Sequence, residues 1–232
     1  MTGWGVDMMV RAVETFEAKA QPDVVVMAVY SGDFRRVRRD YQGNGYGLPK
    51  FALQQGELVE RPPLVFSGWR RSRLGYLAYN TWARRDPNYF PLHAALLERF
   101  ARYGEARGFQ PAVMFVPGER AGEEEQRDFL AAAAKANGMP YLDLTEPIHE
   151  VGADQSYIPG NFHWSETSHA IAGREMRRWI RDEIGLAPQA GFDASIVARS
   201  GDRETHCHDA AHEARPVSPS ERPPEPSSAA AP

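Results

Sequence analysis

One stretch restricts the fold more than any other, the run DVVVMAVY at Asp23–Tyr30. It is apolar on both alternating faces and rich in β-branched residues, which is typical of a strand in a parallel sheet covered by helices on both sides. Apolar residues also recur with helical spacing just before it, from Val6 to Phe16. Because parallel strands are joined through helices, this order predicts an α/β fold.

The alternation of helices and strands continues further along the chain. The predicted elements are a helix from Leu92 that ends at Gly108, a strand at Ala112–Val116, a helix at Glu123–Asn137 followed by Gly138, a strand at Tyr141–Leu144, and a helix capped by Ser165 that reaches Ile184. We predict a flavodoxin-like, doubly wound parallel sheet in a three-layer α/β/α arrangement. Because almost nothing precedes the first helix, we expect the leading strand or strands of such a sheet to be missing from this chain.

Composition divides the chain into a domain and an extension. Residues 1–186 form the predicted α/β domain. Within it, residues 41–90 lack a period and are rich in Gly, Pro, Trp and Tyr, which predicts an irregular insertion with a short hairpin around Gln54–Val59. The loop that opens at Ser31–Phe34 leads toward this insertion. Residues 187–232 form a C-terminal extension, and its Pro/Ser/Ala-rich part from about residue 200 is predicted to be disordered.

Several functional classes receive no support from composition. The 232 residues carry a net charge of −4, which does not favour nucleic-acid binding, and no apolar run approaches membrane-spanning length. No signal peptide is recognisable, so the compartment stays open, as does the oligomeric state. Cys207 is the only cysteine, and its neighbours His206, His208 and His212 match no strong metal-ligand spacing. We therefore assign no metal site.

The stretch YIPGNFHWSETSH at Tyr157–His169 holds the strongest functional candidate. A Pro-Gly turn leads to His163, and Ser165 then provides a helix N-cap. A histidine on a short loop before a helix lies where a sheet-based enzyme places its general base. From these residues alone, a surface loop whose His163 and Trp164 only pack remains the alternative.

Three segments, taken together and in this order, resemble the SGNH/GDSL hydrolases, which are serine esterases and acyl hydrolases on a flavodoxin-like sheet. The segments are GWGVDMM at 3–9, PDVVVMAVYSGDFRR at 22–36 and NFHWSETSHAIAGREM at 161–176. The resemblance covers roughly Gly3 to Ile184 and is weakest in the insertion. It implies hydrolysis of a small-molecule or carbohydrate ester by a serine–histidine mechanism, with no cofactor.

The resemblance also implies roles for individual residues. His163 would be the general base, with Asn161 at a position where the family usually has an acidic residue. Gly3 would donate its N–H to the oxyanion, while Gly32 and Asp33 occupy the third block, where Gly32 replaces the usual oxyanion asparagine. The nucleophilic serine of the family lies upstream of the second block and is absent from this chain.

Two functions therefore remain open. The first is a hydrolase of carboxylic esters or O-acyl groups, which His163, Trp164 and Gly3 favour, although this chain by itself is expected to be inactive. The second is a non-catalytic SGNH-like domain that binds a sugar, an acyl ligand or a protein partner in the same crevice, which Gly32 and Asn161 favour.

Overall fold

The structure is a computed structural model that describes residues 4–37, 50–62, 68, 72, 74–75, 77–78, 81, 90–119, 122–160 and 163–186. The chain divides into two units, Met1–Leu186 and Ala187–Pro232, and all described residues belong to the first. Among the sequence predictions, those for Gly3, Asn161, the histidines and cysteine at 206–212, and the extension at 187–232 lie outside the described residues.

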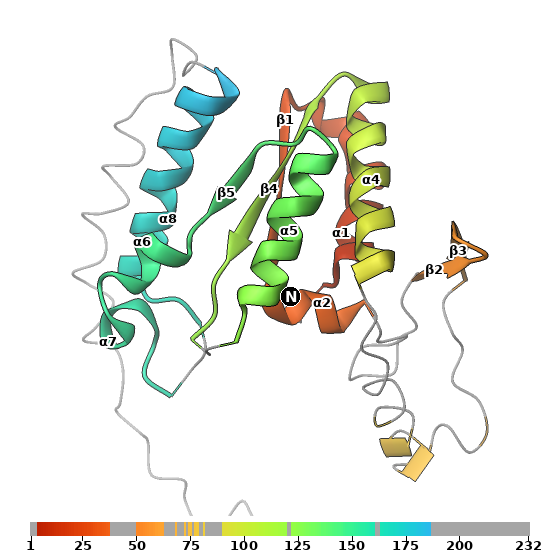
Figure 1. Cartoon of the computed structure of the whole chain (residues 1–232), viewed down its shortest axis with the longest axis horizontal. Coiled ribbons are helices and arrows are strands. Elements are labelled where there is room, and N and C mark those ends of the chain that lie inside the picture. Colours follow the sequence, from red (N-terminus) through yellow and green to blue (C-terminus); the bar gives the residue numbers. More distant parts are fainter. Residues whose placement is uncertain are drawn as a thin grey trace, which may run out of the picture. The chain divides into compact units, whose positions relative to one another are not determined.

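A parallel sheet of three strands in the order β1-β4-β5 forms the centre of this unit (Figure 1). Its strands are β1 at Val24–Tyr30, β4 at Gln110–Val116 and β5 at Tyr141–Asp143. β1 and β4 pair along their whole length, from Val24 opposite Gln110 to Tyr30 opposite Val116. The predicted α/β fold class is thus confirmed in its coarse form, as a mixed fold with a small parallel sheet flanked by helices.

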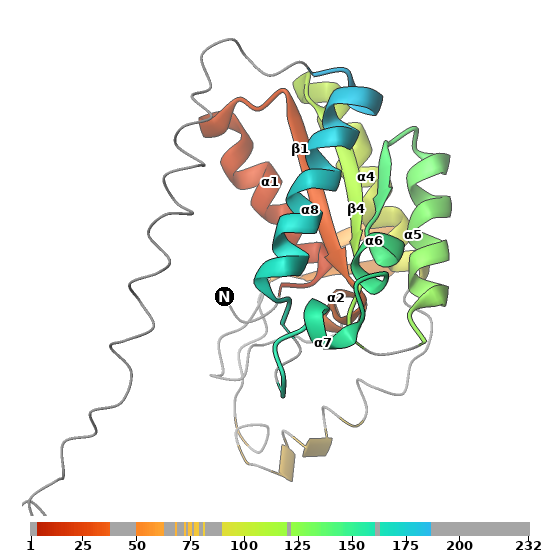
Figure 2. The ribbon, with the colours of Figure 1, turned by 90° about the vertical axis from the view of Figure 1, so that its left-hand side faces the viewer.

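Helices cover both faces of the sheet, as Figures 1 and 2 show. One face packs against α1 at Val6–Ala20, α4 at Phe90–Arg107 and α5 at Glu124–Ala136. The other packs against α6 at Thr145–His149 and α8 at Glu166–Trp179, and the short helix α7 at Ala153–Ser156 contacts both of these helices. Strand side chains alternate between two apolar clusters, because successive residues of a strand point to opposite faces. In β4, for example, Val113 and Phe115 belong to the first cluster and Met114 to the second.

The predicted ends of several helices are confirmed. α4 ends before Gly108, whose φ is 80°, and the turn after α5 contains Gly138 with φ 64°, both in the left-handed region that favours glycine. The hydroxyl of Ser165 caps α8 by accepting a hydrogen bond from the Ser168 N–H at 3.3 Å. The last helix does reach Ile184, but its final part, Ile180–Ile184, is a π-helix.

One local prediction needs correction, and two short helices were missed. Residues Ser31–Phe34 are not an open loop, because Ser31–Arg36 forms the short helix α2, in which the Asp33 carboxylate accepts a hydrogen bond from the Tyr30 N–H at 2.9 Å. Helices α6 and α7 were not predicted. Each spans at most five residues, which is too short for a hydrophobic period to show in the sequence.

The predicted hairpin is present in the insertion. Strands β2 at Lys50–Gln54 and β3 at Glu57–Arg61 pair in antiparallel fashion around Gln55 and Gly56, both of which have positive φ. Lys50 is buried and its ammonium group lies 3.6 Å from the Asp7 carboxylate of α1, so an ion pair attaches the hairpin to the domain. In the part of the chain that the structure describes, no helix combines the length and the apolar character needed to cross a membrane.

Candidate functional site

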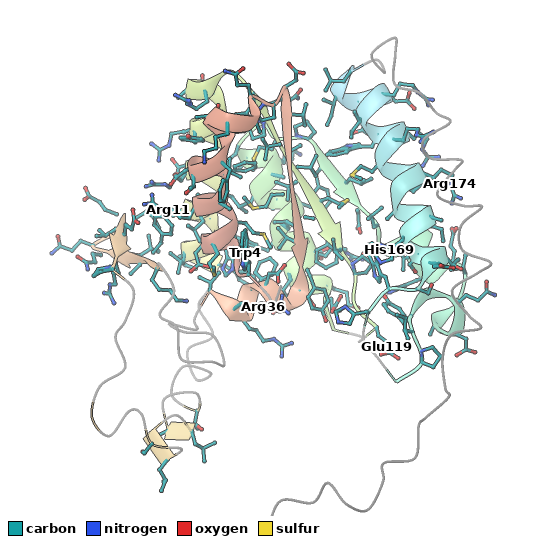
Figure 3. All side chains as sticks on the ribbon, turned by 180° about the vertical axis from the view of Figure 1, so that it is seen from behind. Trp4, Arg11, Arg36, Glu119, His169 and Arg174 are labelled. Atoms are coloured by element: carbon teal, nitrogen blue, oxygen red, sulfur yellow. The ribbon has the colours of Figure 1, made fainter. Side chains whose placement is uncertain are left out.

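The start of α2 after β1, the loop after β4 and the loop before α8 lie at one edge of the sheet. β1 and β4 end side by side, because Tyr30 pairs with Val116. Ligands of open α/β sheets bind outside the carboxyl ends of the strands, so this edge is the place to look for a site. Figure 3 shows Arg36, Glu119 and His169 toward this same end of the domain.

Two side chains attach the His163 loop to the end of β4. The Tyr157 hydroxyl donates to the carbonyl oxygen of Gly118 at 2.7 Å, and the Trp164 indole N–H donates to the carbonyl oxygen of Pro117 at 3.0 Å. Tyr157 and Trp164 also form an antiparallel β-bridge with each other. The loop between them is therefore held at both ends against the carboxyl edge of the central strand.

His163 is exposed and directly precedes the bridge residue Trp164. Its carbonyl oxygen accepts a hydrogen bond from the Ile158 N–H at 3.0 Å, which closes the loop. The capping residue Ser165 follows two positions later, so the backbone passes directly from His163 into α8. The structure thus brings the exposed residue His163 to the carboxyl edge of the sheet, and its role as a base stays a prediction.

The Asp33 side chain makes contacts that stabilise the local structure. It is buried, with one oxygen accepting from the Tyr30 N–H and the other paired with the Arg36 guanidinium. Burial raises the pKa of Asp33 above its ordinary value, while these two contacts act in the opposite direction. The carboxylate stabilises the first turn of α2, and its contacts explain why this residue type follows the strand.

Gly32 is packed against the ring of Tyr30. A Cβ added at Gly32 would lie 2.6 Å from that ring, and one added at Gly118, after β4, would lie 2.7 Å from it. The Tyr30 side chain therefore lies close to the backbone of α2 and of the loop after β4. Glycine is needed at these two positions because any larger residue would displace the ring.

Ser31 and Glu123 link the ends of β1 and β4. The buried Ser31 hydroxyl donates to the Glu123 carboxylate, whose other oxygen accepts from the Gly118 N–H at 2.7 Å. The hydroxyls of three further described serines, Ser156, Ser165 and Ser168, donate to backbone carbonyl oxygens. These four serines are thus bound to groups other than imidazole.

A cavity of about 390 Å³ opens at the same edge, between the amino end of α5 and helices α6 and α7. Its lining includes Glu123, His149 and Tyr157, to which the sequence assigned no role. The Nε2 atom of His149 lies 3.2 Å from the Tyr157 hydroxyl. No sequence spacing connects these groups, since they come from three different elements that only the folded sheet brings together.

Comparison with models of protein families, with curated proteins and with solved structures finds no match to this chain. The site is therefore interpreted from its geometry alone. That geometry brings Gly32, Asp33 and His163 to one edge of the sheet, whereas Gly3 and Asn161 lie outside the described residues.

Proposed function

We propose that this chain is an SGNH/GDSL-type domain on a flavodoxin-like sheet, and that its carboxyl edge binds a carboxylic ester or an O-acyl group beside His163. The observation that carries the proposal is the attachment of the His163 loop to the end of β4 through Tyr157 and Trp164. An exposed imidazole fixed at the carboxyl edge of a parallel sheet is suited to accept a proton from a hydroxyl nucleophile.

The same geometry limits what the chain does by itself. A serine becomes a nucleophile when an imidazole takes its proton, and Ser31 instead donates to Glu123. Among the described residues, Ser156, Ser165 and Ser168 likewise donate to carbonyl oxygens. We therefore infer that the chain as given binds its acyl ligand without turning it over.

A second candidate function is a non-catalytic domain that binds a sugar, an acyl ligand or a protein in the same crevice. The contacts of Asp33 with Tyr30 and Arg36 and those of Ser31 with Glu123 favour it, because they assign these polar groups to structural roles. The two functions share a binding step and differ in whether His163 takes part in proton transfer.

The binding step can be tested by nuclear magnetic resonance of the histidine side chains. We expect tetra-O-acetyl-xylose to shift the His163 resonance, and unacetylated xylose to have a smaller effect. His163→Ala should weaken binding, whereas Lys135→Gln, an exposed change in the last turn of α5, should not. Equal responses to both sugars, or no response, would contradict the proposed acyl specificity.

Turnover is tested separately with p-nitrophenyl acetate. We expect the purified chain and its His163→Ala variant to hydrolyse this ester at the same background rate. A clear rate above background that disappears in the variant would show that the chain supplies its own nucleophile. That result would support the hydrolase and contradict the inferred inactivity.

A further inference from the structure

The cavity beside α5 has no role in the ester site proposed above. It is lined by the acidic residues Glu119, Glu123 and Glu124 together with Arg127, Thr145 and His149. Its volume of about 390 Å³ lies within the range of small-molecule sites, which is roughly 300–1,000 Å³. Its chemistry can be derived from the partners that each polar group already has.

A chain of hydrogen bonds fixes the tautomer of His149. Tyr157 gives its hydroxyl hydrogen to the carbonyl oxygen of Gly118 at 2.7 Å, so its oxygen is left to accept. The atom 3.2 Å from that oxygen is Nε2 of His149, which must therefore carry the hydrogen in the neutral ring. It follows that Nδ1 of His149 is a hydrogen-bond acceptor.

Other polar groups of the lining also lack partners. The Thr145 hydroxyl oxygen is buried and has no hydrogen-bond partner among the described residues. Thr145 precedes His149 by four residues on α6, so both side chains lie on the same side of that helix. The carboxylates of Glu119 and Glu124 form no ion pair with any other residue in the described ranges. The carboxylates of Glu119 and Glu124 and Nδ1 of His149 therefore act as acceptors, while the Thr145 hydroxyl can both donate and accept.

The charge of the lining is negative. Arg127 carries the one guanidinium group among the lining residues. This group already pairs with Asp128 at 3.1 Å and lies 3.8 Å from a carboxylate oxygen of Asp143. The pKa of Tyr157 is raised to about 12, mainly by burial and further by the carboxylates of Glu123 and Glu119. An anion would be repelled, even though the amino end of α5 faces this region, because acidic side chains occupy its first turn.

We propose that this cavity binds a small organic cation, namely a protonated primary amine that also carries hydroxyl groups, as an amino sugar does. The ammonium group would pair with Glu119 and Glu124, and the hydroxyl groups would donate to the acceptors on α6. Such a ligand offers donors to the carboxylates and to Nδ1 of His149, whereas the negative charge of an acidic ligand would be repelled by Glu119 and Glu124. The proposal does not depend on ester binding at His163, although Tyr157 contributes to the structure of both sites.

The experiment compares three ligands of similar size by calorimetry at pH 6. Glucosamine is cationic, N-acetylglucosamine is neutral and glucuronate is anionic. We expect saturable binding of glucosamine, binding of the neutral sugar that is at least about tenfold weaker, and no measurable binding of glucuronate. Equal affinity for the cationic and neutral sugars, or no saturable binding of glucosamine, would overturn the proposal.

Variants locate the binding in this cavity. The double change Glu119→Gln and Glu124→Gln should weaken glucosamine binding about tenfold or more, and Thr145→Val should weaken the binding of all hydroxyl-bearing cations. Glu105→Gln removes an exposed carboxylate from α4 and serves as the control, with no expected effect. Glu119 and Glu124 are exposed, so their change should leave folding intact, which circular dichroism can verify. Unchanged affinity in a folded double variant would contradict the assignment.

Discussion

Tyr157 donates a hydrogen bond of 2.7 Å to the carbonyl oxygen of Gly118, and this bond joins the loop before α8 to the loop after β4. It serves both proposed sites, because it holds one end of the His163 loop and also fixes the tautomer of His149. One buried phenol thus links two loops that are far apart in the sequence. Its removal should affect stability and ligand binding together.

Tyr157→Phe should lower the free energy of unfolding by about 1–3 kcal/mol, because the buried carbonyl oxygen of Gly118 loses the hydrogen bond that it accepts from the Tyr157 hydroxyl. It should also speed hydrogen exchange of the Ile158 N–H, which closes the His163 loop. Tyr141→Phe is the matched control, because the Tyr141 hydroxyl lies at the longer distance of 3.4 Å from the carbonyl oxygen of Arg127. Urea unfolding and exchange of the two variants provide the measurement. Equal losses in both would show that Tyr157 has no special role.

His93 should make the stability of the domain depend on pH. Its ring is buried against Phe34 with ring centres 4.6 Å apart, and burial lowers its pKa from 6.5 to about 3. The unfolded chain therefore binds a proton below pH 6.5 that the folded chain does not accept until about pH 3. Stability is fully present above pH 6.5 and is lost as the pH falls through this window.

His93→Phe should remove that dependence. Relative to the native chain, the variant should gain about 1.4 kcal/mol per pH unit below the unfolded pKa, or roughly 3 kcal/mol by pH 4.5. Urea unfolding of both proteins at pH 7.5 and pH 4.5 measures the difference, and the other titrating groups are common to both. A difference that stays constant between the two pH values would contradict this assignment.

The secondary structure could be predicted from the sequence where a segment is buried on both sides, because such a segment is apolar without interruption. The apolar run that ends at Tyr30 predicted β1, and the glycines at 108 and 138 predicted the ends of α4 and α5. Helix α2 was missed because Asp33 is held by tertiary burial and by Arg36, and a six-residue helix gives no period. The local sequence there resembles a polar turn as closely as it resembles a helix.

The ion pair between Asp7 and Lys50 predicts a second stability effect. Both side chains are buried, and desolvation raises the pKa of Asp7 despite the nearby ammonium group. Lys50→Met would leave a buried carboxylate without its cation, which is expected to cost about 3–5 kcal/mol at neutral pH. A raised carboxyl pKa means that stability is lost as the pH rises through the folded value, so the variant should be less impaired at acidic pH.

A double-mutant cycle measures this coupling. Asp7→Asn combined with Lys50→Met should be clearly less destabilised than the sum of the single changes, because the unpaired charge is removed. Urea unfolding of the four proteins gives the coupling energy. Additive losses would mean that the hairpin is held by its apolar contacts, such as those of Phe51, and that the ion pair contributes little.

The candidate site could be predicted only in part from the sequence. His163 was proposed because a turn, a histidine and an N-cap follow each other within a few residues, and its role stays a prediction. The groups around His149 could not be found in this way, because Gly118, Glu123 and Tyr157 reach one place only through the order of the strands. The spacing of residues in the sequence indicates which residues are neighbours within one element. This cluster instead depends on how the helices pack against the end of the sheet.

The outer strand β1 leads to the last prediction. It is an edge strand of the described sheet, and Ala28 is exposed on the face that also carries the half-buried Val26. An apolar, β-branched edge without charged side chains can pair with another chain. We expect the protein to self-associate at high concentration and Ala28→Lys to reduce this association, since a lysine on an edge strand opposes pairing. Ala170→Lys, the same change at an exposed position of α8, should have no such effect. Sedimentation velocity over a concentration series measures all three proteins, and a native chain that stays monomeric throughout would show that this edge is not available for pairing.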